Sequence, residues 1–228
     1  FRTEVRDADF FRGGIRRLTP ADFDYAHELG YVIKLIATAR KVDGRIQARV
    51  HPVFLPNTHP LAKVDGVYNA VELEGDLVDW AMFQGPGAGA RPTASAVLAD
   101  VLAISRSIAT GAPPPALPTI GPALPIEPMA ELRTGYYIRL PVNDRPGVMA
   151  QITAVLGDLN VSLASVIQLA TAMHRDATGG DEAAQAAEIV ITTHVAKEAD
   201  VQEAVHRLSA LEPVDEVGNL IRVEERTK

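Results

Sequence analysis

A dense run of prolines between residues 111 and 129 constrains the fold of this chain more than any other feature. Seven of the 16 prolines in the 228 residues lie there. Proline lacks the backbone N–H group that helices and sheets use, so a segment this rich in proline is expected to be a stiff, extended spacer that neither coils nor pairs. The sequence therefore predicts two folded regions, 1–110 and 135–228, joined by a proline-rich linker over 111–134.

The first region is predicted to be an antiparallel sheet with flanking helices. Thr19 and Asp22 mark the start of a short helix, and Gly30 marks its end. Four strand-like runs follow, joined by short turns such as Asp43-Gly44, which favour an antiparallel meander because parallel crossovers need about a dozen residues. Trp80 is expected in the core of this region. The predicted strands are 31–40, 45–55, 67–74 and 77–83, and a helix with one apolar stripe is expected over 93–109.

The second region has the order strand, helix, strand, strand, helix, strand. Within about 90 residues, that order predicts a ferredoxin-like sandwich with two helices on one face of an antiparallel sheet. The stretch 171–187 is interpreted as a loose hairpin extension. The fold class is therefore α+β. The predicted strands are 136–142, 161–169, 188–195 and 219–224, and the predicted helices are 147–156 and 198–211.

Composition excludes several functional classes. The formal net charge is −7 and cysteine is absent, which gives no electrostatic reason for nucleic acid as a partner and no thiolate chemistry. No uninterrupted apolar run approaches the roughly 20 residues that cross a bilayer, so no membrane partner is expected. The six histidines are scattered without H-x-x-x-H spacing, and no metal site is predicted.

A glycine-rich turn precedes the 93–109 helix. Gly85, Gly87 and Gly89 would let the backbone approach a phosphate, with the amides of the first helical turn facing the anion. The spacing is G-x-G-x-G, however, and no strand with a ribose-binding acid follows about 20 residues later, as a complete dinucleotide-binding unit requires. A phosphate-contacting turn and a purely structural turn both remain open.

Six stretches of residues 1–109 resemble the later part of bacterial monofunctional homoserine dehydrogenases. The resemblance implies NAD(P)H-dependent reduction of L-aspartate 4-semialdehyde to L-homoserine, with NADP or NAD contacted by Gly85, Gly87 and Gly89. It also implies a cytoplasmic homo-oligomer that serves threonine, methionine and isoleucine biosynthesis. The stretches are Ile15–Phe23, Glu28–Leu35, Ala48–Pro52, His59–Ala62, Val64–Val71 and Gly85–Val97.

The same resemblance implies that the catalytic groups lie elsewhere. In that family the Rossmann unit and the catalytic Asp/Lys pair precede the segment that matches Phe1. No catalytic residue is therefore assigned in this chain, and the chain alone is expected to be inactive. Lys34 lies within a strand pattern and is interpreted as a residue on a solvent-facing or interface side of the sheet.

The second region opens with Tyr136–Ala150, which resembles the start of an ACT domain. The sequence D-R-P-G-V after a strand carries the resemblance. It implies an amino-acid effector, threonine being expected, held near Asn143, Asp144 and Gly147, because a carboxylate suits helix amides. The alternative is that Asn143 and Asp144 only cap the helix and that Gly147 relieves a tight turn.

Three functions follow from these patterns. The leading hypothesis is a homoserine dehydrogenase represented by its substrate and dimerisation region, the closing helix of its nucleotide domain and its ACT domain. The second is a free-standing amino-acid-binding protein for regulation or assembly, without catalysis. The third is a different oxidoreductase whose later part has the same architecture.

Overall fold

The computed structural model describes residues 1, 3–112, 120–170 and 186–224. They form an α+β fold, as predicted, and divide into two compact units. The first unit comprises Phe1–Glu4 and Asn57–Ala123, and the second comprises Val5–Pro56 and Leu124–Lys228. Each unit is described separately below.

The second unit begins with a capped helix and a long hairpin. Helix α1 (Pro20–Glu28) starts at Thr19, whose backbone N–H donates to the side chain of Asp22, and Gly30 follows the helix with a φ of +81°. Strands β2 (Tyr31–Val42) and β3 (Arg45–Pro56) pair along their whole lengths. The turn at Asp43-Gly44 has positive φ at both residues, as the sequence predicts.

The ferredoxin-like order is also confirmed. The sheet order β10-β6-β8-β7 is antiparallel throughout, and α3 and α4 contact each other. The expected hairpin extension over 171–187 lies outside the described residues, apart from Ala186 and Ala187 in β8. The elements are β6 (Arg133–Asn143), α3 (Val148–Asp158), β7 (Leu163–Ala170), β8 (Ala186–Thr193), a short β9 (Ala196–Lys197) that pairs with β6, α4 (Glu198–Ser209) and β10 (Asn219–Val223).

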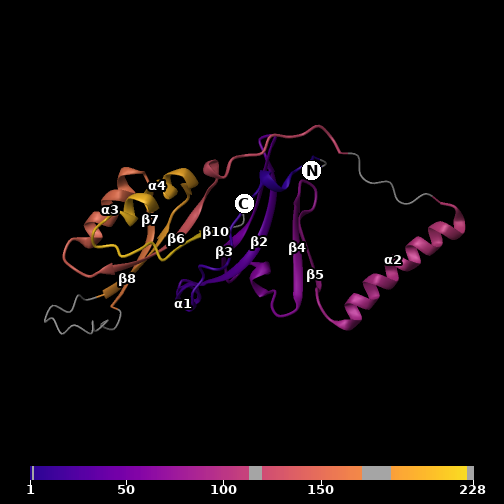
Figure 1. Cartoon of the computed structure of the whole chain (residues 1–228), viewed down its shortest axis with the longest axis horizontal. Coiled ribbons are helices and arrows are strands. Elements are labelled where there is room, and N and C mark those ends of the chain that lie inside the picture. The colour runs from indigo at the N-terminus through magenta and orange to yellow at the C-terminus, as the bar shows by residue number, and fades with distance from the viewer. Residues whose placement is uncertain (2, 113–119, 171–185, 225–228) are drawn as a thin grey trace. The chain divides into compact units, whose positions relative to one another are not determined.

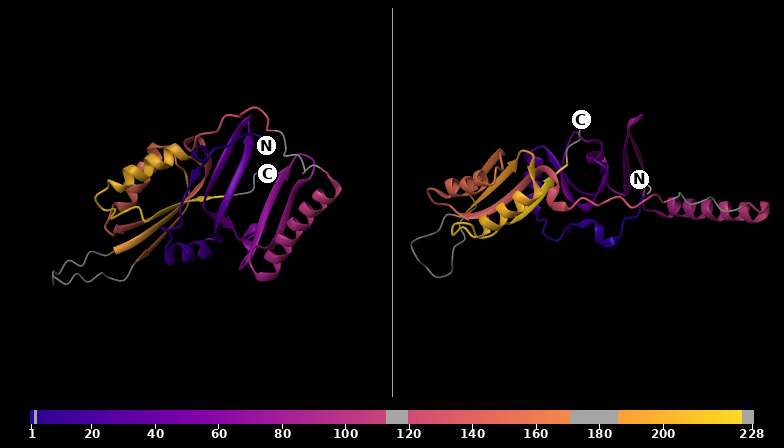
Figure 2. Two further views of the ribbon diagram at one scale, coloured as in Figure 1. Left: turned by 45° about the vertical axis from the view of Figure 1, so that its right-hand side comes forward. Right: turned by 90° about the horizontal axis from the view of Figure 1, so that it is seen from above.

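Alternate residues of β6 face two different cores. Tyr136, Ile138 and Leu140 pack with α3 and α4 in the larger core, and Figures 1 and 2 show both helices on the same side of this sheet. Tyr137, on the opposite face, stacks on Phe54 of β3 and shares a smaller core with Tyr25 of α1. Helix α1 therefore covers the face of the ferredoxin-like sheet that its own helices leave open.

One continuous sheet joins the two sequence regions. Strand β10 pairs with β6 on one edge and runs parallel to β3 on the other, with Arg222 opposite Val53. Strand β1 (Phe11–Arg12) is also parallel to β3. The predicted four-stranded meander is wrong, because β3 uses this edge for β1 and β10 and does not pair with the strand that follows it.

The end of the proline-rich segment also pairs with the sheet. Ile46 of β3 donates its N–H to the carbonyl of Pro125 and accepts from the N–H of Glu127, forming a parallel bridge with Ile126. The prediction that the whole segment avoids sheet pairing is wrong here. Proline lacks the donor but keeps its carbonyl acceptor, and the non-proline residue two positions later supplies the donor.

The first unit has little core of its own. It contains the short helix η2 (Pro60–Lys63), the hairpin of β4 (Tyr68–Gly75) and β5 (Asp79–Pro86), and helix α2 (Ala90–Thr110). His59 and Ala62 are the two buried residues in the described part of this unit. Trp80 is 45% exposed, so the prediction that it lies in the core is wrong, and α2, which was predicted to carry one apolar stripe, buries no side chain.

Helix α2 also passes a simple test for a membrane-crossing helix. It has 21 residues and a mean hydropathy of 1.2 in its most apolar window. The sequence did not predict this property, because Asp100 and Arg106 interrupt the apolar residues of the helix. Exposed apolar side chains on α2 include Val97, Leu98, Val101, Leu102, Ile104 and Ile108.

Candidate functional site

The glycine-rich turn connects β5 directly to α2. Gly85 is still within the strand and pairs with Asn69, while the N–H of Gly87 donates to the carbonyl of Val67 at 2.8 Å. Gly89 precedes the helix with φ +123° and ψ 151°, a conformation that only glycine adopts without strain. The three predicted glycines therefore lie along one short strand-to-helix connection.

The turn is crowded by a side chain at Gly87 but is open to solvent at the start of α2. A Cβ atom at Gly87 would lie 1.8 Å from Nδ2 of Asn69, so the side chain of Asn69 occupies the space that the glycine leaves. Residues 86–91 are exposed, and the first turn of α2 contains Arg91 and no acidic residue. Free amide groups beside a cation favour an anion at this helix end.

The expected effector loop follows β6. Asn143 ends the strand, and its N–H donates to the carbonyl of Pro213 at 2.9 Å. Asp144 accepts a hydrogen bond from Gln168 of β7 at 3.1 Å, and Gly147 precedes α3 with φ +92°. Gly147 is the N-cap residue of α3 and has no side chain to cap it, so Asn143 and Asp144 do not occupy the cap position, whereas the positive φ of Gly147 agrees with the alternative that this glycine relieves a tight turn.

Neither Lys34 nor the buried His59 belongs to a metal-binding group in the described residues. Lys34 is half-buried on β2, opposite Val53. His59 is buried, its Nδ1 accepts from the N–H of Leu61, and its Nε2 lies 4.0 Å from Glu72. Within the described ranges, no three histidine, aspartate, glutamate or cysteine residues lie together in a group that could hold a metal ion.

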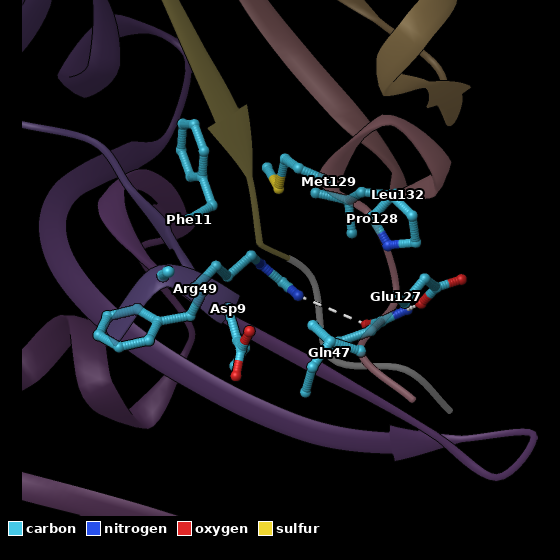
Figure 3. Close-up of a pocket in the computed structure, with 12 residues that line it drawn as sticks. Asp9, Phe11, Gln47, Arg49, Glu127, Pro128, Met129 and Leu132 are labelled. Carbon is cyan, nitrogen blue, oxygen red and sulfur yellow. Dashed lines mark hydrogen bonds between the residues drawn. The ribbon is translucent and has the colours of Figure 1, made fainter. Parts of the chain in front are cut away.

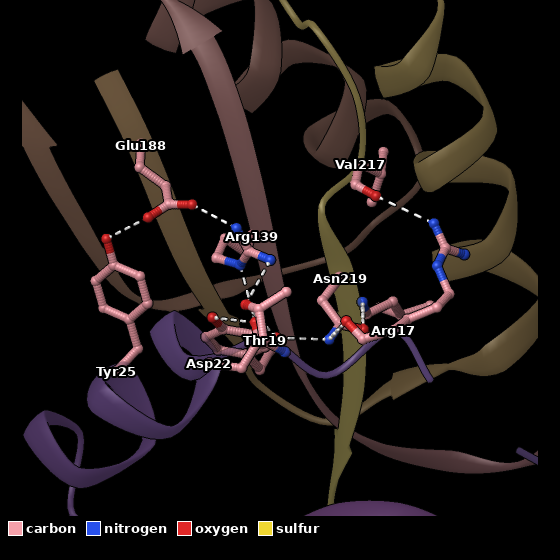
Figure 4. Close-up of polar contacts among 10 residues, drawn as sticks. Arg17, Thr19, Asp22, Tyr25, Arg139, Glu188, Val217 and Asn219 are labelled. Atoms are coloured by element: carbon pink, nitrogen blue, oxygen red, sulfur yellow. Dashed lines mark hydrogen bonds and ion pairs between the residues drawn. The ribbon is translucent and has the colours of Figure 1, made fainter. Parts of the chain in front are cut away.

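A buried polar network that sequence analysis missed fixes α1 to the ferredoxin-like sheet (Figure 4). Asp22 is completely buried and accepts hydrogen bonds from Arg139 at 2.8 Å, Asn219 at 2.9 Å and Tyr137 at 3.1 Å. Arg139 also binds Glu188 of β8 at 2.5 Å. Burial alone would raise the pKa of Asp22, but its hydrogen bonds and the charge of Arg139 lower it. The Thr19-to-Asp22 spacing identified the helix start but not these distant partners.

A second buried polar layer lies between β3, β10 and α4. Arg222 binds Glu198, which also accepts from Tyr136 at 2.9 Å. Burial opposes the charge on Glu198, but hydrogen bonds and charge from Arg222 lower its pKa. Arg49 binds Glu224 at 2.9 Å. The Arg49–Glu224 pair joins residues of the two sequence regions.

A cavity of about 310 Å³ opens beside this layer (Figure 3). Its apolar wall includes Phe11, Met129 and Leu132. Gln47 lies on the polar side with Arg49, whose Nη1 donates to Oε1 of Gln47 at 3.4 Å. The cavity therefore combines an apolar wall with a charged group that is already neutralised by Glu224.

Comparisons with known proteins agree along almost the whole chain. The family description "Homoserine dehydrogenase" matches residues 1–102, and "ACT domain" matches residues 136–213. A homoserine dehydrogenase of Mycobacterium tuberculosis is 38% identical across 98% of this chain and 50% of its own length, and one of Neisseria gonorrhoeae is 39% identical with the same coverage. A crystal structure of a homoserine dehydrogenase from Thiobacillus denitrificans matches 99% of this chain and 50% of its own, with a TM-score of 0.82 and 36% identity.

The fold and loops thus define a protein in which part of a dehydrogenase is followed by an ACT domain. The chain spans about half the length of the curated relatives it matches. It belongs to the homoserine dehydrogenase family and is a partial homoserine dehydrogenase, as the sequence motifs indicated.

Proposed function

We propose that this chain is the later half of an NAD(P)H-dependent homoserine dehydrogenase, which reduces L-aspartate 4-semialdehyde to L-homoserine for threonine, methionine and isoleucine biosynthesis. The observation that supports this most is similarity to curated homoserine dehydrogenases along 98% of the chain, through both regions. The enzyme acts in the cytoplasm on small molecules, and the net charge of −7 favours neither nucleic acid nor an anionic membrane as a partner.

The glycine-rich turn contributes to the cofactor site. Gly85, Gly87 and Gly89 carry no side chains of their own, although Asn69 lies at the Cβ position of Gly87, and the adjoining amides and Arg91 favour the negative charge of a phosphate. When bound, the NADP or NAD cofactor supplies the hydride. The residues of this chain position it, and the catalytic aspartate and lysine belong to the half of the enzyme that this chain does not include.

The ACT domain senses an amino acid, and threonine is the effector proposed. Asn143, Asp144 and Gly147 form its site at the end of β6, with the carboxylate at the amides of α3 and the ammonium at a side-chain oxygen. The positive φ of Gly147 and the open space at its Cβ position leave the backbone accessible to such a ligand.

The first unit supports a larger assembly. A two-stranded sheet alone is marginally stable, and β4 and β5 expose Val71, Leu73 and Phe83. Helix α2 exposes a second apolar surface. These surfaces favour a homo-oligomer completed by the missing half of the enzyme, and they argue against a free-standing regulatory protein.

The proposal is tested by placing the amino-terminal half of the Neisseria gonorrhoeae homoserine dehydrogenase ahead of Phe1. We expect this fusion to oxidise NADPH with aspartate semialdehyde, and the 228-residue chain to be inactive. Turnover by the short chain would contradict the placement of the catalytic groups, and a folded but inactive fusion would contradict the function.

The cofactor role of the turn is tested within the same fusion. Arg91→Gln should raise the KM for NADPH about tenfold, the cost of losing roughly one charge-assisted hydrogen bond. Arg106→Gln, an exposed arginine near the other end of the same helix, is the matched control and should leave the KM unchanged. An unchanged KM in Arg91→Gln would remove this turn from the cofactor site.

A further inference from the structure

We infer that a second cavity in the second unit binds a small carboxylate that also carries a hydroxyl or ammonium group. This β3–β10 cavity lies between the segment Gly13–Leu18, β3, α4 and β10, and its volume is about 280 Å³. That volume is just below the lower end of the range for small-molecule sites, roughly 300 Å³. Asn143, Asp144 and Gly147 do not line it, so it is separate from the proposed effector loop.

His51 supplies an unused hydrogen-bond acceptor in the wall of this cavity. The side chain is 1% exposed, and its Nδ1 lies 2.9 Å from the carbonyl of Pro52. A carbonyl can only accept, so Nδ1 carries the proton and Nε2 is left as a bare acceptor. Nε2 is buried and has no hydrogen-bond partner among the described residues.

The surroundings of His51 keep the ring neutral and close to the cavity. Burial, with the nearby charges of Arg222 and Arg49, lowers its pKa to about 4. Gly13 lies against Cβ of His51, and a Cβ added at Gly13 would come within 2.7 Å of that atom. A neutral imidazole with a bare Nε2 requires a donor, because buried polar atoms normally have a partner.

Arg17 gives the cavity its positive charge. Figure 4 shows its guanidinium pointing to the carbonyl of Val217, a contact of 3.4 Å, and it has no acidic partner in the described part of the chain. By contrast, Arg222 is neutralised by Glu198. Asn219 uses its side-chain N–H groups on Asp22 and on the backbone of Arg17. Among the described residues that line the cavity, Arg17 is therefore a cation without an acidic partner and His51 supplies a buried acceptor without a donor.

These two groups define the ligand chemistry. A carboxylate satisfies Arg17 through a charge-assisted hydrogen bond, and a hydroxyl or ammonium on the same molecule can donate to Nε2 of His51. Acetate would satisfy only the first group, and a simple amine only the second. A small hydroxy acid or amino acid satisfies both.

The test uses the 228-residue chain and three probes of similar size: glycolate, glycine and acetate. Calorimetry measures affinity, and the nitrogen-15 chemical shift of Nε2 in His51 reports whether that atom accepts a hydrogen bond. We expect glycolate or glycine to bind about tenfold more tightly than acetate and to shift the Nε2 signal, as one added hydrogen bond predicts.

Matched variants distinguish binding in this cavity from a general effect of positive charge on the surface. Arg17→Gln should weaken binding about tenfold, whereas Arg16→Gln, at a neighbour that is also exposed, should leave it unchanged. His51→Phe should abolish the preference for glycolate over acetate. If that variant does not fold, the arginine pair and the acetate comparison still decide the question.

Three results would overturn the inference. They are equal affinity for acetate and the other two probes, equal effects of Arg16→Gln and Arg17→Gln, and an Nε2 signal that no probe moves. The last result would mean that only water occupies the cavity.

Discussion

Asp22 lies at the centre of the contact between α1 and the ferredoxin-like sheet. It is fully buried and binds Arg139, Tyr137 and Asn219, all of which come from the ACT side of the sequence. The sequence predicted that Asp22 lies in the first turn of a helix, because an acidic side chain is favourable there. Its partner Arg139 lies 117 residues away, and no local pattern can predict a pairing over that separation.

Removing this carboxylate should destabilise the fold strongly. Asp22→Ala leaves Arg139 buried with one of its two acidic partners missing, a loss of about 3–5 kcal/mol in the free energy of unfolding. Chemical denaturation of the purified chain measures it. Asp24→Ala, an exposed acid on the same helix, should change stability by less than about 0.5 kcal/mol. Equal effects of the two variants would show that the network contributes nothing specific.

His51 should make stability depend on pH. Its pKa is lowered from 6.5 to about 4, chiefly by burial. Between those values the unfolded chain binds a proton that the folded chain does not, so the free energy of unfolding falls as the pH decreases. The full effect is roughly 3 kcal/mol.

Denaturation at several pH values between 7 and 4, for the parent chain and His51→Gln, checks this expectation. The parent should lose more stability than the variant across the window. The carboxyls of Asp22 and Glu198, whose pKa values are also lowered from 3.8 and 4.5, begin to lose their contribution only near the acidic end of this window, and they do so in parent and variant alike. Parallel pH profiles for parent and variant would contradict the assignment to His51.

At the scale of elements, local patterns predicted most of the structure. Capping residues, the Asp43-Gly44 turn and alternating apolar residues placed α1, the β2–β3 hairpin and the ferredoxin-like order. They could not place the parallel pairing of β3 with β10, because edge pairing between distant strands depends on packing and not on the strand's own sequence. They also assigned Trp80 to the core, because an apolar side chain in a strand pattern does not reveal what covers it. The cofactor and effector assignments remain predictions.

The turn before α2 should depend on one glycine in particular. Gly89 has φ +123°, so Gly89→Ala introduces strain of about 1–3 kcal/mol at the start of the helix. The N–H of Thr93 donates to the carbonyl of Gly89, and its hydrogen exchange should therefore become faster. Gly85→Ala, without strain or a steric clash, should leave this exchange unchanged. Unaltered protection in Gly89→Ala would show that the turn tolerates a side chain.

At the scale of the whole molecule, the ACT domain shares a sheet with strand β3 of the first sequence region and is not an independent domain joined only by a linker. Its strand β10 pairs with β3, and α1 covers one face of its sheet. A segment 135–228 alone would expose Tyr137, Val190 and Ile221 to water and leave Arg139 without Asp22.

We therefore expect segment 135–228 to have a lower melting temperature than the 228-residue chain and to bind a hydrophobic dye such as ANS. Thermal denaturation and dye fluorescence of both proteins measure this. An isolated segment as stable as the parent would show that the shared sheet contributes little. Effector titrations are accordingly best made on the full 228 residues.

The position of β10 in the sheet sets an order of events during synthesis. This strand lies between β3 and β6, so it joins the two halves of the sheet, yet ribosomes make it after every other strand there. Until it emerges, the nascent protein has an open edge on each side of the gap. A premature stop codon a few residues before Asn219 would leave both edges unpaired, and such edges are sites of aggregation.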